Sequence, residues 1–417
     1  MFSQPQQPLP PKPGFPVRPL MALMVTQTLG WGCATSLIGV IAAPIRADLG
    51  MSDAVLYGGT SLMFLTGAAM APVAGMLSDR IGGLRTLCLG SPLLGLALLA
   101  LSVAQGPASY LAAWLIFGVS MHLALATAAY NGLASVSGQG AYRSIGLLTL
   151  ATGLCSTIMW PLSEMMLQHM DWRELCRFYA LLMLALATPL HIWLAVTASP
   201  DRNAARAPAP SPAHVPPEAT KSAFRLMLMA QVLVTSLGTG IAILIIDILV
   251  ALGTERSVAV IAGSLIGVAY LISRGAAVLI GDRIPRMALA RIVFGLLPLT
   301  FLPLLVCVLL ELPVPGWLAI TFGLIYGMPA GLVGVLKPAM PWHIFGSAGY
   351  GRRLGRLAGP TDLATAASPA LMAWLMGTSP KALVVVAIVM ASLAFLCIIR
   401  LSRLAGEGRD HRHYESV

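Results

Sequence analysis

Long apolar segments follow one another along almost the whole chain, and this feature constrains the fold more than any other. Of the 417 residues, 57% are hydrophobic and only 10% are charged, and the mean hydropathy is +0.83. A soluble domain of this length cannot bury so much apolar surface, so the lipid bilayer must be the solvent. Each crossing of a hydrocarbon layer about 30 Å thick needs roughly 20 helical residues, because only a helix satisfies its own backbone hydrogen bonds there.

The apolar segments predict an all-α polytopic membrane protein with twelve transmembrane helices. A polar stretch at 198–222, rich in Pro and Ala, is predicted to be a cytoplasmic linker between a six-helix bundle at 19–197 and another at 223–404. Residues 1–18 and 405–417 are predicted to be cytoplasmic tails, the first of them disordered. The spans are predicted at 19–45, 53–76, 84–105, 109–136, 144–168, 174–196, 223–252, 257–280, 288–310, 315–338, 358–377 and 381–404.

The basic residues indicate the orientation of the chain in the membrane. If both termini lie in the cytoplasm, most of the 26 Lys and Arg fall in cytoplasmic tails and loops, as the positive-inside rule requires. The net charge of +10 is then explained by topology and needs no nucleic-acid partner. The first tail has no apolar core, which argues against a cleavable signal peptide. We therefore expect a monomeric, multi-pass protein of the cell inner membrane.

The hairpins after the second and eighth predicted spans carry related motifs. The first reads Gly75-x-Leu77-x-Asp79-Arg80-x-Gly82-x-x-Arg85, and the second contains Asp282-Arg283-Ile284. Glycines permit a tight turn, a carboxylate can lie at the N-terminus of a neighbouring helix, and arginines can pair with acids or lipid phosphates. Because Asp79-Arg80-Ile81 recurs as the second tripeptide in the equivalent hairpin, the sequence indicates an internal duplication.

The motifs resemble the loop signature of the major facilitator superfamily of secondary transporters. Segments around Trp160-Pro161 and Tyr350-Gly351 are similar to a bacterial branch of that family whose solutes are mostly unassigned. The resemblance implies two pseudo-symmetric bundles that rock about a central site. It also implies that Asp79 braces the eleventh span and Asp282 the fifth in the outward-facing state. The hairpin residues would then gate the site rather than bind substrate.

By the same resemblance, the first, fourth, seventh and tenth spans surround a central cavity. Burying a charge in hydrocarbon costs roughly 3 kcal/mol or more, so ionisable residues within spans need a partner or a wet cavity. Aromatic side chains can stack on a ligand and amides can orient it, but each can equally be a packing residue. The candidates for the substrate cavity are Gln27, Trp31, His122, Tyr130, Asn131, Tyr326 and Lys337.

Several ionisable residues are candidates for proton coupling or charge pairing. In the fourth span, drug–proton antiporters of the superfamily often carry an arginine, whereas this chain offers His122 instead. His122 is either a proton-exchanging group, since its ordinary pKa is about 6.5, or a neutral histidine bonded to a neighbouring helix. Asp247 is either a proton acceptor or an interfacial residue. Arg274, Lys337 and Asp362 either form a structural ion pair, or one of the two cations receives an anionic group of the substrate.

Other functional classes find no support in the sequence. A membrane enzyme would need a metal-spaced His/Glu cluster, a nucleophile elbow or a phosphate loop, and an ATP-driven pump would need a Walker motif. The six cysteines lack the spacing of a metal clip or a redox pair. We therefore expect no catalytic residue, metal or cofactor.

The sequence predicts a secondary transporter that moves a small organic solute by alternating access, coupled to protons or another ion. Apolar cavity candidates and a proton-capable histidine favour efflux. Arg274 and Lys337 indicate the alternative, which is uptake or exchange of an organic anion such as a monocarboxylate. The solute itself stays open among drugs, organic acids, amino acids and metalloids.

Overall fold

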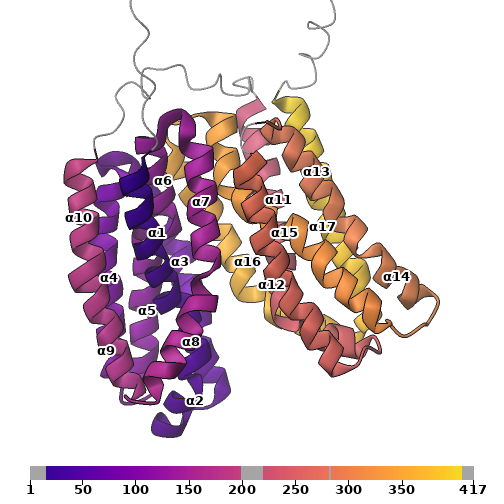
Figure 1. Cartoon of the computed structure of the whole chain (residues 1–417), viewed down its shortest axis with the longest axis horizontal. Coiled ribbons are helices and arrows are strands. Elements are labelled where there is room, and N and C mark those ends of the chain that lie inside the picture. The colour runs from indigo at the N-terminus through magenta and orange to yellow at the C-terminus, as the bar shows by residue number, and fades with distance from the viewer. Residues whose placement is uncertain (1–15, 199–218, 281–282, 406–417) are drawn as a thin grey trace, which may run out of the picture.

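The protein folds into helices that gather into two bundles standing side by side (Figure 1). The computed structural model describes residues 16–198, 219–280 and 283–405, and within these ranges all regular structure is helical. Most of the predicted tails and linker, together with Gly281 and Asp282, lies outside the described residues. The predicted all-α fold with two bundles is confirmed, whereas the exact bundle boundaries stay a prediction.

The first bundle contains several interrupted spans. Its first span bends by 41° at a π-helical segment, and a short 3-10 turn, η2 (Gly138–Gly140), joins the fourth span to the fifth. In chain order the elements are α1 (Val17–Trp31), η1 (Gly32–Ser36), α2 (Ile38–Leu49), α3 (Asp53–Ile81), α4 (Gly83–Ser102), α5 (Pro107–Ala124), α6 (Ala126–Ser137), α7 (Ala141–Gly153), α8 (Cys155–Leu167), α9 (Trp172–Leu182), η3 (Met183–Ala187) and α10 (Thr188–Thr197).

The second bundle is built from longer, mostly continuous helices. Its elements are α11 (Thr220–Ala251), α12 (Arg256–Ile280), α13 (Arg286–Thr300), α14 (Leu302–Leu309), α15 (Gly316–Phe345), α16 (Tyr350–Thr378) and α17 (Pro380–Leu404). α15 continues to Phe345, beyond the predicted end at 338, and α16 begins at Tyr350 rather than at 358. Prolines in both helices remove single backbone donors without ending the helix.

Most of the predicted spans are long and apolar enough to cross a bilayer. Among the described residues, ten helical segments pass on length and composition, some of them made of two successive helices, and the bent pair of α1 with η1 and α2 makes up to eleven. The remaining predicted span is α16, whose 29 residues are long enough but include charges, glycines and prolines that lower its apolarity. α16 packs against α3, α11 and α17, so most of its length contacts protein rather than lipid.

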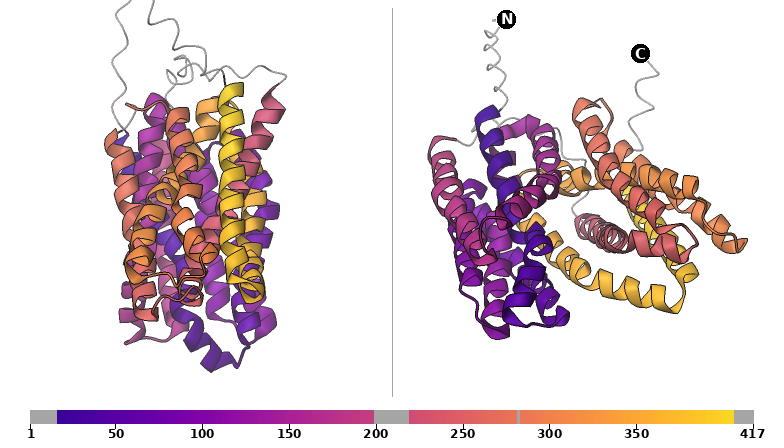
Figure 2. Two further views of the ribbon diagram at one scale, coloured as in Figure 1. Left: turned by 90° about the vertical axis from the view of Figure 1, so that its right-hand side faces the viewer. Right: turned by 60° about the horizontal axis from the view of Figure 1, so that its bottom comes forward.

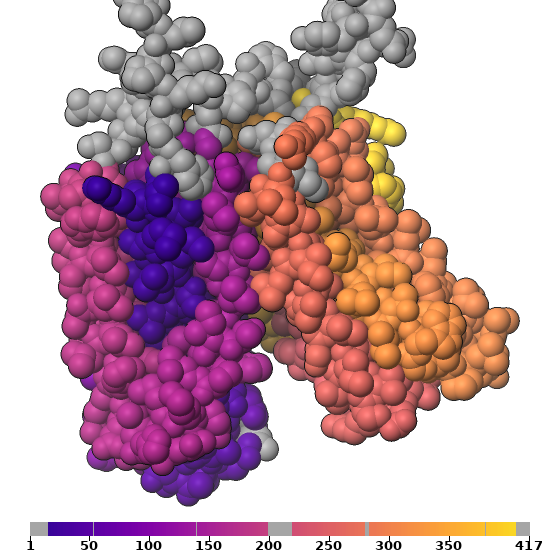
Figure 3. All heavy atoms as spheres, viewed as in Figure 1, coloured from indigo at the N-terminus to yellow at the C-terminus, as the bar shows by residue number. Residues whose placement is uncertain are grey.

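Each bundle has its own apolar core, and large apolar side chains also cover the outside, where Leu279 and Leu309 are exposed. In the left view of Figure 2 most helices run roughly along one direction, and in its right view the two bundles lie apart. The bundles meet at the end of the molecule where α1 begins and α17 ends. A hollow separates them at the opposite end (Figure 3). The contacts between bundles are made mainly by α3 with α16 and by α7 with α12 and α15.

Candidate functional site: a cavity between the two bundles

A break in the fourth span positions the centre of the site. α5 ends at Ala124 and α6 begins at Ala126, and Leu125 between them has φ −115° and ψ −139°, outside the helical region. The side-chain amide of Gln27 donates a hydrogen bond of 2.8 Å to the carbonyl oxygen of Ala124. A polar side chain of the first span therefore binds a carbonyl at the break, which would be costly to leave unsatisfied in a membrane.

His122 lies in the last turn of α5, next to this break, and bridges the two bundles. Its Nε2 is 2.6 Å from Oδ2 of Asp362 on α16, and its Nδ1 is 3.0 Å from the hydroxyl of Thr127 on α6. The side chains of His122 and Asp362 are only 5% and 12% exposed. Each of these two buried polar side chains therefore has a hydrogen-bond partner in the other bundle.

Lys337 on α15 is the second charged group of the site. Its Nζ donates to the hydroxyl of Thr235 over 2.6 Å, and no ion pair joins it to an acid within the described residues. Pro341, one turn further along, has no N–H to donate to the carbonyl of Lys337. The amide of Gln231 on α11 donates to that carbonyl instead, over 3.2 Å. The missing N–H of the proline therefore leaves a carbonyl on α15 to which a side chain of α11 binds beside the lysine.

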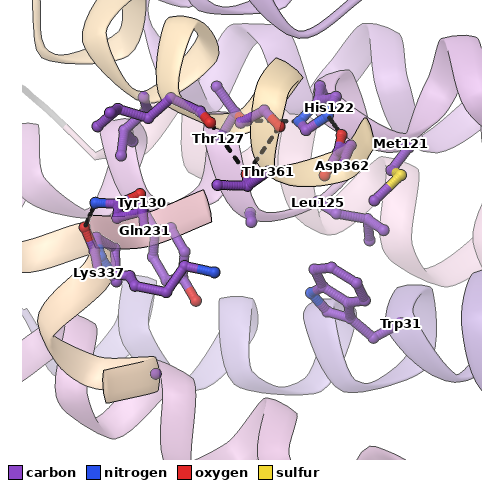
Figure 4. Close-up of a pocket in the computed structure, with 16 residues that line it drawn as sticks. Trp31, Met121, His122, Leu125, Thr127, Tyr130, Gln231, Lys337, Thr361 and Asp362 are labelled. Atoms are coloured by element: carbon purple, nitrogen blue, oxygen red, sulfur yellow. Dashed lines mark hydrogen bonds and ion pairs between the residues drawn. The ribbon is translucent and has the colours of Figure 1, made fainter. Parts of the chain in front are cut away.

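These groups surround a cavity of about 230 Å³ in the middle of the molecule. Figure 4 shows His122, Asp362, Thr127 and Thr361 together on one part of its wall, with the indole of Trp31 apart from them. A mostly apolar wall with a few convergent polar groups is typical of small-molecule sites. The lining residues are Trp31, Met121, His122, Leu125, Ala126, Thr127, Tyr130, Gln231, Gly334, Lys337, Pro338, Leu354, Leu357, Ala358, Thr361 and Asp362.

Arg274 on α12 does not line this cavity but lies behind its wall. Its Nη1 donates to the carbonyl of Thr149 on α7 over 3.0 Å, and its Nε donates to the carbonyl of Gly331 on α15 over 3.3 Å. An added Cβ at Gly334, which lines the cavity, would come within 2.8 Å of Nη2. We call this contact of α7 with α12 and α15, made through Arg274, Thr149 and Gly331, the arginine seam.

The three charges considered as an ion pair in the sequence do not pair with one another. Arg274 contacts carbonyls, Lys337 contacts a hydroxyl, and Asp362 contacts His122. The reason is geometric, since the face of α16 that carries Asp362 is turned toward α3 and α5 rather than toward α12. Asp247 lies elsewhere, 3.8 Å from Arg256, with both side chains exposed.

The structure brings together only part of the predicted cavity set. Trp31, His122, Tyr130 and Lys337 line the cavity. Gln27 holds the helix break beside it, and Asn131 instead donates to the hydroxyl of Ser78 over 2.8 Å and to Asp79 over 3.4 Å.

Tyr326 is the remaining member of that set and packs in the core of the second bundle. Its ring lies 5.5 Å from that of Phe322 and 5.4 Å from that of Phe301, measured between centroids. It also lines a separate small cavity inside that bundle. An aromatic side chain buried between two others packs the core and does not face the central cavity.

The first hairpin motif lies where the bundles meet. The carboxylate of Asp79, near the end of α3, accepts hydrogen bonds from the backbone N–H groups of Gly351 (2.7 Å) and Arg352 (2.9 Å) at the start of α16. Gly82 adopts φ 93°, which only glycine adopts easily, and so allows the chain to turn into α4. Arg80 and Arg85 are exposed.

Of the second hairpin motif, only part lies within the described residues. Arg283 is exposed and donates to the carbonyl of Leu279, near the end of α12, over 3.5 Å. Asp282, which was predicted to brace the fifth span, lies outside the described part of the chain.

Glycines allow α3 and α16 to approach closely along this contact. An added Cβ would come within 2.3 Å of the Gly351 carbonyl oxygen if placed on Gly75, and within 2.2 Å of the Ala71 carbonyl oxygen if placed on Gly355. Gly359, one turn further, would meet the Ala68 carbonyl oxygen at 2.9 Å. We call this contact, in which Ala71 and Gly75 pack on Gly351 and Gly355, the glycine seam.

Of the residues that make the glycine seam, Gly75 was among the predicted hairpin residues, but the contact of Ala71, Gly351 and Gly355 was not predicted. Their signal was available, since Gly351, Gly355 and Gly359 recur every four residues and so share one helix face, and small residues at this spacing typify close helix contacts in membranes. Asp362 lies three residues further along the same face and reaches His122. Thr127 and Gln231 were also missed, and no local pattern distinguishes them.

Among the residues that the structure describes, no three His, Cys, Asp or Glu side chains come close enough together to hold a metal ion.

Comparison with known proteins identifies the family and the fold. A family model described as Major Facilitator Superfamily matches residues 23–341. No curated protein sequence matches the chain significantly. Among solved structures, the chain resembles the proton:xylose symporter XylE bound to 6-bromo-6-deoxy-D-glucose, with 14% identity, a TM-score of 0.70, and coverage of 92% of this chain and 95% of that chain.

Two further structures show the same fold at similarly low identity. The transporter FucP in the outward conformation has 12% identity and a TM-score of 0.69, over 92% of this chain and 98% of that chain. The human organic anion transporter MFSD10 (TETRAN) has 19% identity and a TM-score of 0.66, over 94% of this chain and all of that chain (100%).

Proposed function

The chain belongs to the Major Facilitator Superfamily and is a membrane-embedded secondary transporter rather than an enzyme, and from this premise we propose that it exports a small organic solute in exchange for protons. The solute would bind in the cavity between the bundles, and His122 with Asp362 would carry the proton. The observation that carries the proposal is the 2.6 Å contact between these two side chains, which joins the bundles inside the cavity wall.

The contact couples protonation to the movement of the bundles. His122 belongs to the first bundle and Asp362 to the second, so a rocking movement that parts α5 from α16 also parts imidazole from carboxylate. A carboxylate left alone in a low-dielectric cavity is costly, and protonation removes most of that cost. The proton occupancy of the pair therefore biases the equilibrium between the two arrangements of the transporter.

The direction of transport rests on the orientation and on the character of the wall. With the termini in the cytoplasm of a cell with an inner membrane, the end where the bundles part faces outward. Trp31, Leu125 and Leu357 contribute aromatic and apolar surface to the cavity, which suits a moderately apolar solute. Protons entering from the outside would reach the pair and drive the solute out.

The proposal is tested by proton-driven flux after a solute has been found. A thermal-shift screen of purified protein across drugs, carboxylates, amino acids and metalloids identifies binders, since a ligand at 100 times its Kd stabilises by about 2.7 kcal/mol. Everted vesicles acidified inside should then accumulate that solute. We expect His122→Ala and Asp362→Asn each to reduce proton-driven accumulation by at least about tenfold.

A matched control is His169→Gln, which alters an exposed histidine far from the pair and should leave accumulation unchanged. Proton-driven accumulation that persists at the wild-type rate in His122→Ala would contradict the assignment of the pair. Accumulation that ignores the proton gradient in the wild type would contradict the coupling itself.

The alternative function is uptake or exchange of an organic anion such as a monocarboxylate. Lys337 favours it, because this cation lines the cavity and its ammonium donates to a hydroxyl rather than to an acid. A carboxylate in the cavity would supply the missing counter-charge through charge-assisted hydrogen bonds. Arg274 no longer supports this reading directly, since carbonyls occupy two of its nitrogens.

The alternative makes its own prediction. Stabilisation of the protein by carboxylates should disappear in Lys337→Met and persist in Arg274→Lys. If carboxylates stabilise Lys337→Met as strongly as the wild type, the organic-anion function is wrong.

A further inference from the structure

A second cavity, separate from the central one, lies between the first turns of α11 and α16. We propose that it binds the phosphate of an anionic phospholipid head group, and that the lipid stabilises the arrangement in which the bundles touch at this end. The cavity has a volume of about 660 Å³, and Lys221, Arg225, Arg352 and Arg356 line it. It lies at the end of the molecule where the glycine seam joins the bundles.

The spacing of the four cations directs them to one place. Lys221 and Arg225 lie four residues apart on α11, and Arg352 and Arg356 lie four residues apart on α16, so each pair shares a helix face. Like charges at this spacing destabilise a helix slightly, and here two such pairs line the same cavity. The positive-inside rule explains why cations lie at this end, but it does not explain why two helices direct them into one hollow.

Within the described residues, the charge of this cluster is not balanced. No ion pair joins any of its four cations to an acid in that part of the chain. The neighbouring Arg353 is already used, because its Nη1 donates to the carbonyls of Phe345, Gly346 and Ala348 at the end of α15.

Asp79 is the one acid in the cavity wall, and its carboxylate is engaged as well. Its Oδ1 accepts from the N–H of Gly351 and its Oδ2 from that of Arg352. Among the described residues, the four cations outnumber this single carboxylate, so the cavity suits an external anion. Phosphate suits it best, since it accepts several charge-assisted hydrogen bonds at once.

Apolar residues below the cations indicate that the phosphate belongs to a lipid. The rings of Phe224 and Phe345, with centroids 6.4 Å apart, line the same cavity. Met229, the next residue on the face of α11 that carries Lys221 and Arg225, is 55% exposed. A head group at the cations would therefore have exposed apolar surface beneath it for the start of an acyl chain.

On α16 the pattern repeats, since Leu363 lies seven residues beyond Arg356 and is 47% exposed. Basic pockets between helices at a membrane surface bind anionic head groups in this manner.

The position of the site links the lipid to transport. Asp79 comes from α3 of the first bundle, whereas the cations come from α11 and α16 of the second. An anion bound here is surrounded by both bundles only while the glycine seam is closed. It therefore favours that arrangement by its differential affinity for the two states.

The test compares lipid binding by native mass spectrometry on the full-length protein in detergent. We expect the wild type to retain phosphatidylglycerol in preference to phosphatidylcholine, and Arg352→Gln/Arg356→Gln to bind phosphatidylglycerol about thirtyfold more weakly. The matched control is Arg400→Gln/Arg403→Gln, which removes the same charge from exposed positions at the end of α17 and should bind as the wild type does. Lys221→Gln/Arg225→Gln removes the other half of the cluster independently and should give a similar loss.

Two outcomes would overturn the proposal. The first is equal retention of phosphatidylglycerol by the wild type and both cluster variants. The second is displacement of the lipid by inorganic phosphate at millimolar concentration, with equal stabilisation by phosphate alone, which would assign the site to a soluble anion. Because Asp79 contacts the backbone of Arg352 and not its side chain, the glutamine variants leave the seam contact itself intact.

Discussion

The glycine seam and the arginine seam occupy corresponding places in the two halves, yet they are built in opposite ways. If the halves correspond, α3 is the counterpart of α12, and each of these helices is followed by one copy of the repeated tripeptide. In the glycine seam, α3 meets α16 with backbone against backbone. In the arginine seam, α12 reaches α7 of the other bundle chiefly through the long side chain of Arg274. α12 and α15 belong to the same bundle and pack closely at Gly323 and Gly327.

This contrast indicates which contacts between the bundles tolerate substitution. Backbones in direct contact leave no side chain to adjust, so any added atom must push the helices apart. A guanidinium on a flexible stem can follow a carbonyl that moves by a fraction of an ångström. We therefore expect the glycine seam to be either fully closed or open. The arginine seam, in contrast, should keep its hydrogen bonds when the helices shift slightly.

The largest effect is expected from Gly355→Val. Its Cβ would meet the Ala71 carbonyl oxygen at 2.2 Å, and overpacking costs about 3 kcal/mol, which is roughly a hundredfold shift away from the closed seam. Spin labels at Arg85 and Arg403, which are exposed on different bundles, should report a longer distance by double electron–electron resonance.

The control for this substitution is Gly377→Val in the same helix, where an added Cβ meets nothing within 4 Å. Its label distances should match those of the unsubstituted protein. An unchanged distance distribution in Gly355→Val would contradict the contrast between the two seams, because the glycine seam would then tolerate added atoms.

A smaller effect is expected from Arg274→Lys. The ammonium keeps the charge but cannot reach the carbonyls of both Thr149 and Gly331 with the geometry of a guanidinium. The loss of one charge-assisted hydrogen bond is worth about 1.5–3 kcal/mol at most. Amide hydrogen exchange near the break between α7 and α8 should accelerate, while the distance between the labels at Arg85 and Arg403 changes less than in Gly355→Val.

Arg283→Lys is the matched control, since that arginine donates to the carbonyl of Leu279 near the end of α12 and takes no part in the arginine seam. It should leave exchange at the break unaltered. If Arg274→Lys parts the labels as far as Gly355→Val does, the two seams are equally rigid and the contrast between them is wrong.

The smallest effect is expected from Asp79→Asn. The amide oxygen can still accept from Gly351 or Arg352 but lacks the charge that strengthens both bonds. We expect a loss of about 1 kcal/mol, or roughly a fivefold rise in the population with parted labels.

The control is Asp171→Asn, because Asp171 caps α9 in the same manner but within one bundle. It should lower thermal stability without changing the label distances. An Asp79→Asn protein with a larger distance change than Gly355→Val would show that charge, and not close packing, holds the glycine seam.

Much of the fold was predictable from the sequence. Apolar length locates helices such as α11 and α12 to within a few residues, because each must cross the same layer of lipid. The breaks at Leu125 and Leu154 were not predicted, since no glycine or proline occupies either position. The break at Leu125 is held by Gln27 from another span, and that contact leaves no trace in the local sequence.

The candidate site was predictable only in part. Composition and family resemblance selected His122 and Lys337 as polar residues at membrane depth, and both line the cavity. The same reasoning also selected Asn131 and Tyr326, which face a hairpin and a packed core instead. Order along the chain indicates the depth of a side chain in the membrane, but a small rotation of the helix decides what that side chain meets.

The repeated tripeptide indicates related halves, and the long apolar segments predict many membrane crossings with charged hairpins outside the lipid, because hydrophobicity acts on each segment separately. The contact of His122 with Asp362, 240 residues away, and the closure of one end of the molecule by glycines of α16 become visible only in the folded protein. Such contacts depend on how whole helices rotate and pack against one another, and that is a property of the assembled bundles rather than of any single segment.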